Sequence, residues 1–283
     1  MTDATLKSDL RSTWESAALG WAKWEHVFAT TFSDATDELI DMAGIQPGMH
    51  VLDLACGAGS QSIQAAQRVG PSGKVVASDI SGTMLEHVRR NAALAGLQNV
   101  ETLECAADEV VDTQSAPFDA SICRLGLMLF PSPREALEAV RDVLKPGARC
   151  AALVFAGPAK NPFMAQPMAI LLHHADKSPP APGQPGIFSL GAQNVLEQLM
   201  RDSGLGDLKT KVVRAPLVLP SASDALQLMQ EAAGAYRAVV ADLSEEEKCS
   251  AWNEVYLYLR QFEADDGFKT ELELIIASGA RPS

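Results

Sequence analysis

A glycine-rich segment between two acidic residues is the part of the sequence best suited to binding a ligand. The segment reads VLDLACGAGS over residues 51–60 and joins a short apolar run to a helix-like run. Glycines at such a junction let the chain turn tightly and let a ligand approach the backbone. Asp79 ends the next apolar run, 20 residues after Gly59, where a carboxylate typically accepts hydrogen bonds from ribose hydroxyls. The spacing predicts a nucleoside-like ligand.

The residue types in the loop restrict which nucleoside this is. No lysine follows the glycines, so the phosphate-binding pattern Gly-Lys-Ser/Thr is absent. Ser62 stands where the dinucleotide pattern G-x-G-x-x-G/A has Gly or Ala. Asp53, just before the glycines, would repel a pyrophosphate and attract an ammonium or sulfonium group. The loop therefore favours a cationic, phosphate-free adenosine compound, which points to S-adenosylmethionine (SAM).

The elements that must position these residues alternate along the chain. Strand-like runs are predicted at His50–Leu54, Lys74–Ile80, Val100–Cys105, Phe118–Cys123, Arg149–Phe155, Lys209–Leu219 and Phe268–Ala277. Helices are predicted over residues 5–44 in two pieces, and at Ser60–Val69, Gly82–Ala95, Pro133–Leu144, Phe163–Ala175, Gln193–Ser203, Ser223–Val240 and Glu245–Phe262. Strands that alternate with helices of this length predict a parallel sheet covered on both faces.

Several motifs resemble those of one family. Residues 53–59, DLACGAG, resemble motif I of class I SAM-dependent methyltransferases, with Ala55 in place of the first glycine. Asp79 matches the ribose-binding acid, and Phe118-Asp119, residues 123–128 (CRLGLM) and residues 144–147 (LKPG) resemble the fourth motif and its trailing helix. The Trp14–Trp24 segment is similar to that of ubiquinone/menaquinone-biosynthesis small-molecule methyltransferases. The resemblance covers roughly residues 10–155.

The resemblance implies an α/β, Rossmann-like, doubly wound sheet of seven strands, mostly parallel with an antiparallel last strand. It implies a helical lid segment at residues 1–44, a SAM-binding core at 45–156, and cap helices with the completing strands of the same domain at 157–283. The implied activity is transfer of the SAM methyl group to a small organic acceptor, with release of S-adenosylhomocysteine. Two other functions stay open: a non-catalytic SAM-binding partner protein, and a nicotinamide-dependent oxidoreductase, which Ser62 disfavours.

The resemblance also implies a set of cofactor-binding residues. They are Asp53, Gly57, Ala58, Gly59, Asp79, Ile80, Met84, Ala107, Asp108, Arg124 and Trp21. The family usually has an Asp-Ala-Glu-like run after the third strand, but residues 105–109 read CAADE. Either Asp108 holds the adenine amino group from a shifted position, or backbone groups near Ala107 do so. No catalytic residue is predicted, because methyl transfer depends largely on positioning.

No metal is expected. Arg124 and Met128 stand where metal-dependent relatives would need carboxylates, and the five histidines lack metal spacing. The acceptor is expected against aromatic and flexible apolar residues outside the sheet. These are Trp14, Trp21, Trp24, Phe163, Met164, Met168, Met229, Tyr236, Trp252 and Tyr256.

Composition limits the partners and the compartment. The 283 residues include 36 Asp and Glu against 23 Lys and Arg, giving a formal net charge of −13. This charge disfavours binding to nucleic acid or to anionic membranes. The opening residues lack the apolar core of a signal peptide, and five cysteines without paired spacing fit free thiols. We therefore expect a cytoplasmic protein with a small-molecule acceptor; the sequence does not determine the oligomeric state.

Overall fold

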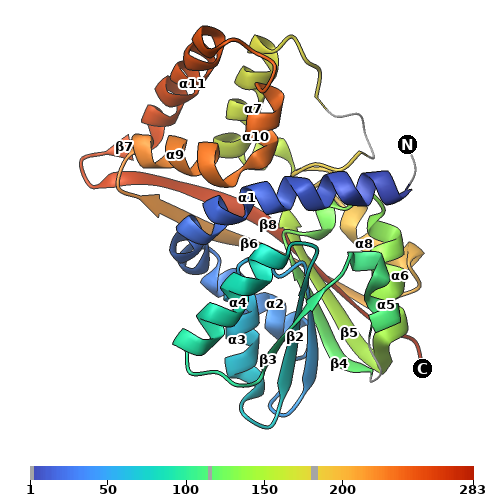
Figure 1. Ribbon diagram of the computed structural model, residues 1–283. Helices are drawn as coiled ribbons and strands as arrows, with labels where there is room; N and C mark the ends of the chain where they lie inside the picture. The colour runs from blue at the N-terminus through green and yellow to red at the C-terminus, as the bar shows by residue number, and fades with distance from the viewer. Residues whose placement is uncertain (1–2, 114–116, 180–183) are drawn as a thin grey trace.

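Seven long strands form one sheet in the order β3-β2-β1-β4-β5-β8-β6 (Figure 1). The computed structural model describes residues 3–113, 117–179 and 184–283. The long strands are β1 (His50–Leu54), β2 (Lys74–Asp79), β3 (Val100–Glu104), β4 (Phe118–Arg124), β5 (Leu144–Phe155), β6 (Gly206–Leu219) and β8 (Gly267–Ala280). β1 to β5 pair in parallel, whereas β8 is antiparallel to both β5 and β6. The predicted fold class, including the antiparallel last strand, is confirmed.

One short strand was not predicted. β7 (Glu263–Ala264) pairs with the start of β8 and makes the sheet eight-stranded. Two residues carry no alternating pattern that sequence could reveal. Gly267, which begins β8 directly after the turn, has φ +107°, a conformation that favours glycine.

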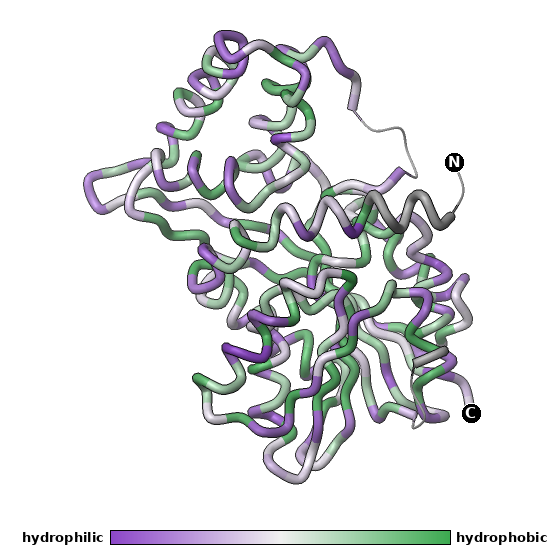
Figure 2. Tube along the Cα trace, in the orientation of Figure 1, coloured by the Kyte–Doolittle hydropathy of each residue, from purple (hydrophilic) through white to green (hydrophobic). Residues whose placement is uncertain are grey.

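Helices cover both faces of the sheet. They are α1 (Asp3–Thr31), α2 (Ser33–Met42), α3 (Ser60–Val69), α4 (Gly82–Leu94), α5 (Val110–Thr113), α6 (Pro133–Val143), α7 (Pro162–His174), α8 (Val195–Asp202), α9 (Ala222–Ala232), α10 (Gly234–Val239) and α11 (Glu245–Leu259). In Figure 1, α2, α3 and α4 lie together on one side, and α5, α6 and α8 lie on the other. The central strands are consequently buried on both faces, and apolar residues dominate them in Figure 2.

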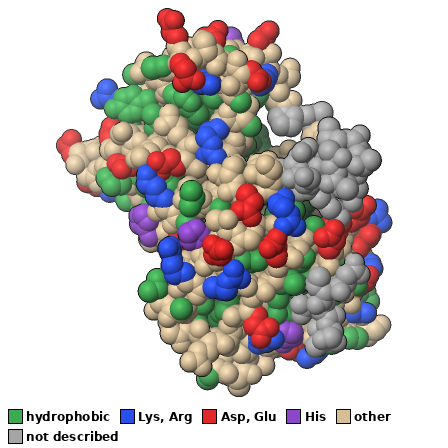
Figure 3. Space-filling view, viewed as in Figure 1, with side chains coloured by type: hydrophobic (Ala, Val, Ile, Leu, Met, Phe, Trp, Pro, Cys, Tyr) green, Lys and Arg blue, Asp and Glu red, His purple; other side chains and the backbone are tan. Residues whose placement is uncertain are grey.

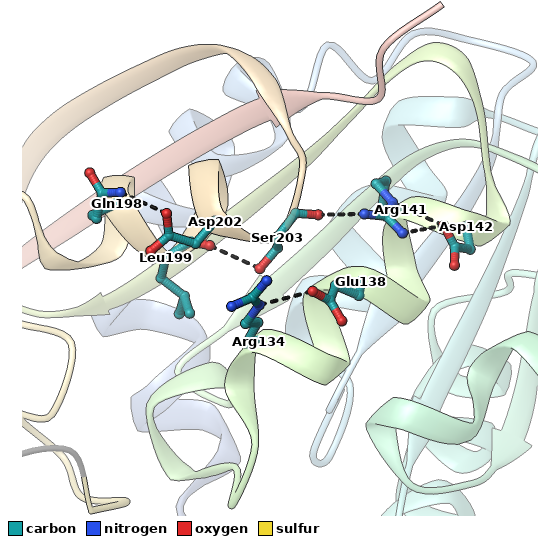
Figure 4. Close-up of polar contacts among 8 residues, drawn as sticks. All are labelled: Arg134, Glu138, Arg141, Asp142, Gln198, Leu199, Asp202 and Ser203. Carbon is teal, nitrogen blue, oxygen red and sulfur yellow. Dashed lines mark hydrogen bonds and ion pairs between the residues drawn. The ribbon is translucent and has the colours of Figure 1, made fainter.

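Polar contacts join α6 to α8 within the layer formed by α5, α6 and α8 (Figure 4). The Arg141 guanidinium on α6 donates a hydrogen bond to the Ser203 carbonyl oxygen at the end of α8, at 2.9 Å. Within α6, Arg134 also pairs with Glu138 at 2.9 Å. These contacts are partly or fully exposed to solvent and connect helices that cover one face of the sheet, so we assign them a structural role.

The cap differs from the prediction of two long helices. The predicted helix over residues 223–240 is two helices, α9 and α10, because Ala233 has a non-helical backbone with ψ +84°. α7 and α11 pack with them. β6 and β8 have 14 residues each, and in Figure 1 they extend beyond the shorter parallel strands to carry this cap. The buried Tyr236 hydroxyl on α10 donates to the Met164 carbonyl oxygen on α7 at 2.9 Å, which ties the cap together.

α1 crosses between the cap and the core (Figure 1). It packs on α9 through Gly20, where an added Cβ would lie 1.9 Å from the Glu231 carbonyl oxygen. Beside this contact, Trp24 Nε1 donates to the Glu231 carboxylate at 2.7 Å, and Lys23 pairs with the same carboxylate. Glycine lets the two helices approach, and the Glu231 contacts hold them there.

On the face shown in Figure 3, acidic and basic side chains are interspersed. Within residues 3–113, 117–179 and 184–283, no helix is both long enough and apolar enough to cross a bilayer.

We expect Gly20→Ala to destabilise the protein by about 1–3 kcal/mol, because the new methyl group would push α1 away from the α9 backbone. In an unconstrained helix the same change would stabilise by up to about 1 kcal/mol. Gly82→Ala is the control, since a Cβ there meets only the flexible ends of the Glu104 and Glu15 side chains. Urea unfolding measures both. A Gly20→Ala protein as stable as the wild type would contradict the close contact.

Candidate functional site

A cavity opens at the carboxyl ends of β1, β2 and β4, beneath α1. It encloses about 1180 Å³ of empty space, part of which is open to solvent. The lining residues are Leu10, Trp14, Trp21, Glu25, Phe32, Leu54, Ala55, Cys56, Gly57, Ala58, Gln61, Ser78, Asp79, Ile80, Met84, Cys105, Ala106, Ala107, Asp108, Arg124, Leu125, Gly126, Leu129, Phe130, Pro131, Ser132, Glu135 and Ala136.

The glycine loop forms the floor of the cavity between β1 and α3. Ala55, Gly57 and Gly59 have positive φ values of 54°, 55° and 95°. A Cβ on Gly59 would lie 2.9 Å from a Val88 methyl carbon, so this glycine lets α3 pack closely on α4. A Cβ on Gly57 would meet no atom within 4 Å. The loop backbone therefore has open space above Gly57, where a ligand can approach it.

Asp79 ends β2 and lines the cavity beside the loop. Its two carboxylate oxygens accept hydrogen bonds from the backbone N–H groups of Gly57, at 2.9 Å, and Ser81, at 3.0 Å. Burial raises the pKa of Asp79, and these backbone hydrogen bonds act in the opposite direction. A carboxylate oxygen has room for more than one hydrogen bond, so Asp79 is oriented by the protein and can still accept from a ligand.

Asp53 lies below the loop instead of facing the cavity. Its side chain is fully buried, it is absent from the cavity wall, and it accepts hydrogen bonds from the Ser62 hydroxyl and from Gln61 Nε2. Burial raises the pKa of Asp53 to about 7, although Ser62 and Arg124 oppose the rise. Direct contact of Asp53 with a ligand stays a prediction; in the structure, its hydrogen bonds fix the loop to the first turn of α3. Gly59 likewise does not line the cavity.

We expect Asp53→Asn to become progressively more stable than the wild type as pH rises from about 4 to about 7. In this window the folded wild type keeps a proton on Asp53 that the unfolded chain has released, so its free energy of unfolding falls with rising pH. The asparagine variant lacks this loss. The rise in pKa from 3.8 to about 7 corresponds to roughly 4 kcal/mol at most.

Denaturant titrations at several pH values measure this difference, with Asp242→Asn as the surface control because its side chain is 86% exposed. A difference between Asp53→Asn and wild type that stays constant from pH 4 to 7 would count against a buried, protonated Asp53.

Arg124 ends β4 and is buried at the wall of the cavity. Its guanidinium donates to the Thr36 hydroxyl at 3.0 Å and to the Ser60 hydroxyl at 2.6 Å, and lies 5.5 Å from the centre of the Phe32 ring. Burial lowers the pKa of Arg124, while the negative charges of Glu25 and Asp53 raise it. Arg124 is therefore a positive group held by neighbours on several elements.

Glu25 on α1 was missed by the sequence analysis. It lines the cavity, and its Oε1 atom is buried without a hydrogen-bond partner among the described residues. Burial raises the pKa of Glu25, while Arg124 and hydrogen bonding by Ser60 lower it. The sequence could have indicated Glu25 through its position four residues after Trp21, because this spacing places both side chains on one face of a helix.

The remaining predicted cofactor residues lie along the side of the cavity formed by β2 and β3. Ile80, Met84, Ala107 and Asp108 all line it, as do Ala58 on the loop and Trp21 on α1. Asp108 lies in a short 3₁₀ helix, Ala107–Glu109, directly after β3. Both the Asp108 and the backbone alternatives for adenine binding remain predictions.

Ten aromatic and flexible residues were expected to contact the acceptor, and two of them, Trp14 and Trp21, line the cavity. Trp24 instead bonds to Glu231, and Tyr236 is buried inside the cap. Their place is taken by residues after β4, namely Leu125, Gly126, Leu129, Phe130 and Pro131. The sequence analysis assigned this segment only to a motif, because its approach to the cavity depends on a left-handed turn at Leu125, φ 62°.

Across the described parts of the chain, no group of three or more His, Cys, Asp or Glu side chains is arranged to hold a metal ion. The expectation that the reaction needs no metal remains a prediction.

Comparison with known proteins identifies the domain. Residues 45–177 match a family model described as a methyltransferase domain. The chain is 37% identical, over 127 residues, to the ubiquinone/menaquinone biosynthesis C-methyltransferase UbiE of Cronobacter sakazakii, which covers 44% of this chain and 49% of that protein. The chain thus matches about half the length of such curated relatives.

Solved structures show the same fold over most of the chain. The YcgJ protein of Bacillus subtilis is 16% identical with a TM-score of 0.58, covering 89% of this chain and 99% of that one. Phosphoethanolamine N-methyltransferase 2 of Haemonchus contortus is 15% identical with a TM-score of 0.54, covering 93% and 57%. These structures show the fold alone; the family match and the curated relatives show that residues 45–177 contain a class I SAM-dependent methyltransferase domain, as the motifs predicted.

Proposed function

We propose that this protein transfers the methyl group of SAM to a small organic acceptor in the cavity beneath α1. The observation that carries the proposal is Asp79, a carboxylate oriented by the Gly57 N–H at the end of β2 and lining a cavity whose floor is the glycine loop. This is the arrangement that recognises the ribose of a nucleoside. SAM supplies a methyl group on a sulfonium, which needs no further activation.

The residues of the cavity fit SAM. Asp79 accepts from the ribose hydroxyls, and Ile80, Met84, Ala107 and Asp108 enclose the adenine. Open space above Gly57 admits the ligand, and the unpartnered Oε1 atom of buried Gln61 is an acceptor for its ammonium group. The relatives support the same donor, since the Haemonchus enzyme was solved with S-adenosylhomocysteine.

A small acceptor fits the space that remains. Trp14, Phe32, Leu129 and Phe130 give the cavity apolar walls, and apolar walls with few polar groups are typical of small-molecule sites. Similar folds include enzymes named for small acceptors, such as the phosphoethanolamine N-methyltransferase and geranyl diphosphate methyltransferase.

The chain's own contribution is to position the two reactants and exclude water. Methyl transfer needs the reacting atoms about 3–3.5 Å apart and aligned. The loop and Asp79 fix the donor, and α1 closes over it with Trp14 and Trp21. We therefore assign residues 1–44 to a helical lid segment, 45–156 to the SAM-binding core, and 157–283 to the cap and completing strands. A lid must open to admit and release ligands.

We expect Asp79→Asn to weaken SAM binding about 10- to 150-fold, because a charge-assisted hydrogen bond contributes about 1.5–3 kcal/mol. Calorimetric titration with SAM and with NAD⁺ measures this, and only SAM should bind the wild type. Glu101→Gln is the control, because it removes an acid from the exposed side of β3.

An unchanged SAM dissociation constant in folded Asp79→Asn would remove this residue from the site. Preference for NAD⁺ would favour the oxidoreductase alternative. Tight SAM binding without S-adenosylhomocysteine formation, in the presence of a cellular small-molecule extract, would favour a non-catalytic SAM-binding protein.

A further inference from the structure

Three residues that line the cavity each carry a buried polar atom without a hydrogen-bond partner among the described residues: Trp21 Nε1, Glu25 Oε1 and Gln61 Oε1. Six such side-chain atoms occur in the described residues, and half of them lie at this one place. A buried polar atom left unpaired costs about 1–3 kcal/mol, and native proteins rarely keep one without a reason. Their concentration here indicates polar groups of a ligand.

Two of the three belong to the same face of α1. Trp21 and Glu25 are four residues apart, so their side chains lie one turn from each other. Trp21 offers a hydrogen-bond donor and Glu25 an acceptor. Both are held in place: the Trp21 ring packs on Phe28 with centroids 4.5 Å apart, and the Glu25 carboxylate faces Arg124 and Ser60. The helix thus presents a fixed donor–acceptor pair.

The sheet order separates Arg124, which the Glu25 carboxylate faces, from the end of the cavity at Asp79. Asp79 ends β2 and Asp108 follows β3, whereas Arg124 ends β4, on the other side of β1. A donor with its ribose at Asp79 extends along the loop toward β4, so its sulfonium end comes to the Arg124 side. Gln61, on the core side of the loop, is the acceptor for the donor's ammonium group, which leaves Trp21 and Glu25 for a second molecule.

On the basis of the proposed function, we propose that Trp21 and Glu25 bind the methyl acceptor, and that the acceptor is a small apolar compound carrying an O–H or N–H group. That group donates to Glu25 Oε1, while a neighbouring lone pair of the acceptor receives the Trp21 Nε1 hydrogen. The apolar body packs against Phe130 and Leu129.

In the transfer step the oxygen or nitrogen of the acceptor forms a bond to the methyl carbon with its lone pair. The bond from that carbon to sulfur breaks, and its electron pair stays on sulfur. The proton of the O–H or N–H group passes to Glu25 Oε1 and later to solvent. The burial that raises the pKa of Glu25 makes it a better proton acceptor near neutral pH.

The test uses the full-length protein, methyl-labelled SAM, and a panel of small phenols, alcohols and amines, each paired with its O- or N-methylated counterpart. We expect label to enter members with a free O–H or N–H group. For the best of these, Glu25→Gln should lower kcat on the order of 10²- to 10⁴-fold, with the SAM dissociation constant changed less than about twofold. Trp21→Phe keeps the ring and should raise the acceptor KM on the order of tenfold.

The pH profile gives an independent readout. The titratable groups that face Glu25 are Arg124 from β4, His26 from α1 and Cys56 from the loop. In the wild type, kcat/KM should rise with pH as Glu25 loses its proton, and Glu25→Gln should lose this rise. Glu15→Gln makes the same change on α1 outside the cavity wall and should keep it.

Three results would overturn the proposal. The first is transfer of label to carbon alone, or to no compound with a free O–H or N–H group, and the second is an unaltered pH profile in Glu25→Gln. The third is a loss of SAM affinity in Glu25→Gln as large as its loss of turnover, which would assign Trp21 and Glu25 to binding of the donor. Failure of the proposed function itself is distinct, because the wild type would then either not bind SAM in calorimetry or bind SAM without releasing S-adenosylhomocysteine.

Discussion

One guanidinium, that of Arg124, holds together the elements that enclose the cavity. It leaves the end of β4 and donates to Thr36 on α2 and Ser60 on α3, while the Phe32 ring between α1 and α2 covers it. Negative charge on Glu25 of α1 and Asp53 of β1 favours its charged form, against the effect of burial. Removing one partner from such a buried group typically costs about 3–5 kcal/mol. The relative positions of the lid helix, the loop and the sheet therefore depend on this one side chain.

The residues around the cavity also include backbone conformations and buried acids that lower the stability of the folded protein. Ala55 and Leu125 adopt left-handed backbone conformations at the ends of β1 and β4, and both line the cavity. Glu25, Asp53 and Asp79 are acids with pKa values raised by burial. Strained backbone and buried charge cost stability and are commonly retained where binding needs them. Their coincidence supports assigning the ligand site to this place.

Local sequence was sufficient to predict most of the parallel core. β1, β2 and β4 are mostly buried, largely apolar runs, and α3 and α6 have clear boundaries, so the sheet and the position of Asp79 followed from pattern alone. Asp53 was assigned to the ligand because its neighbours are loop residues. Whether its side chain points into the cavity or below the loop depends on the packing of Ser62 and Gln61. Glu25 was missed because its importance comes from Arg124, 99 residues later. The cap aromatics were misplaced because amphipathic spacing does not distinguish a cavity wall from the interior of a helical cluster.

The measurement that tests this account most directly is a crystal structure of the protein with S-adenosylhomocysteine. The account predicts both ribose hydroxyls within about 2.6–3.2 Å of the Asp79 carboxylate and the sulfur atom on the β4 side of the loop. Glu25 Oε1 and Trp21 Nε1 should remain uncovered by the ligand and face the space beyond the sulfur. A ribose bound away from Asp79, or an amino-acid moiety bonded to Glu25 and Trp21, would contradict it.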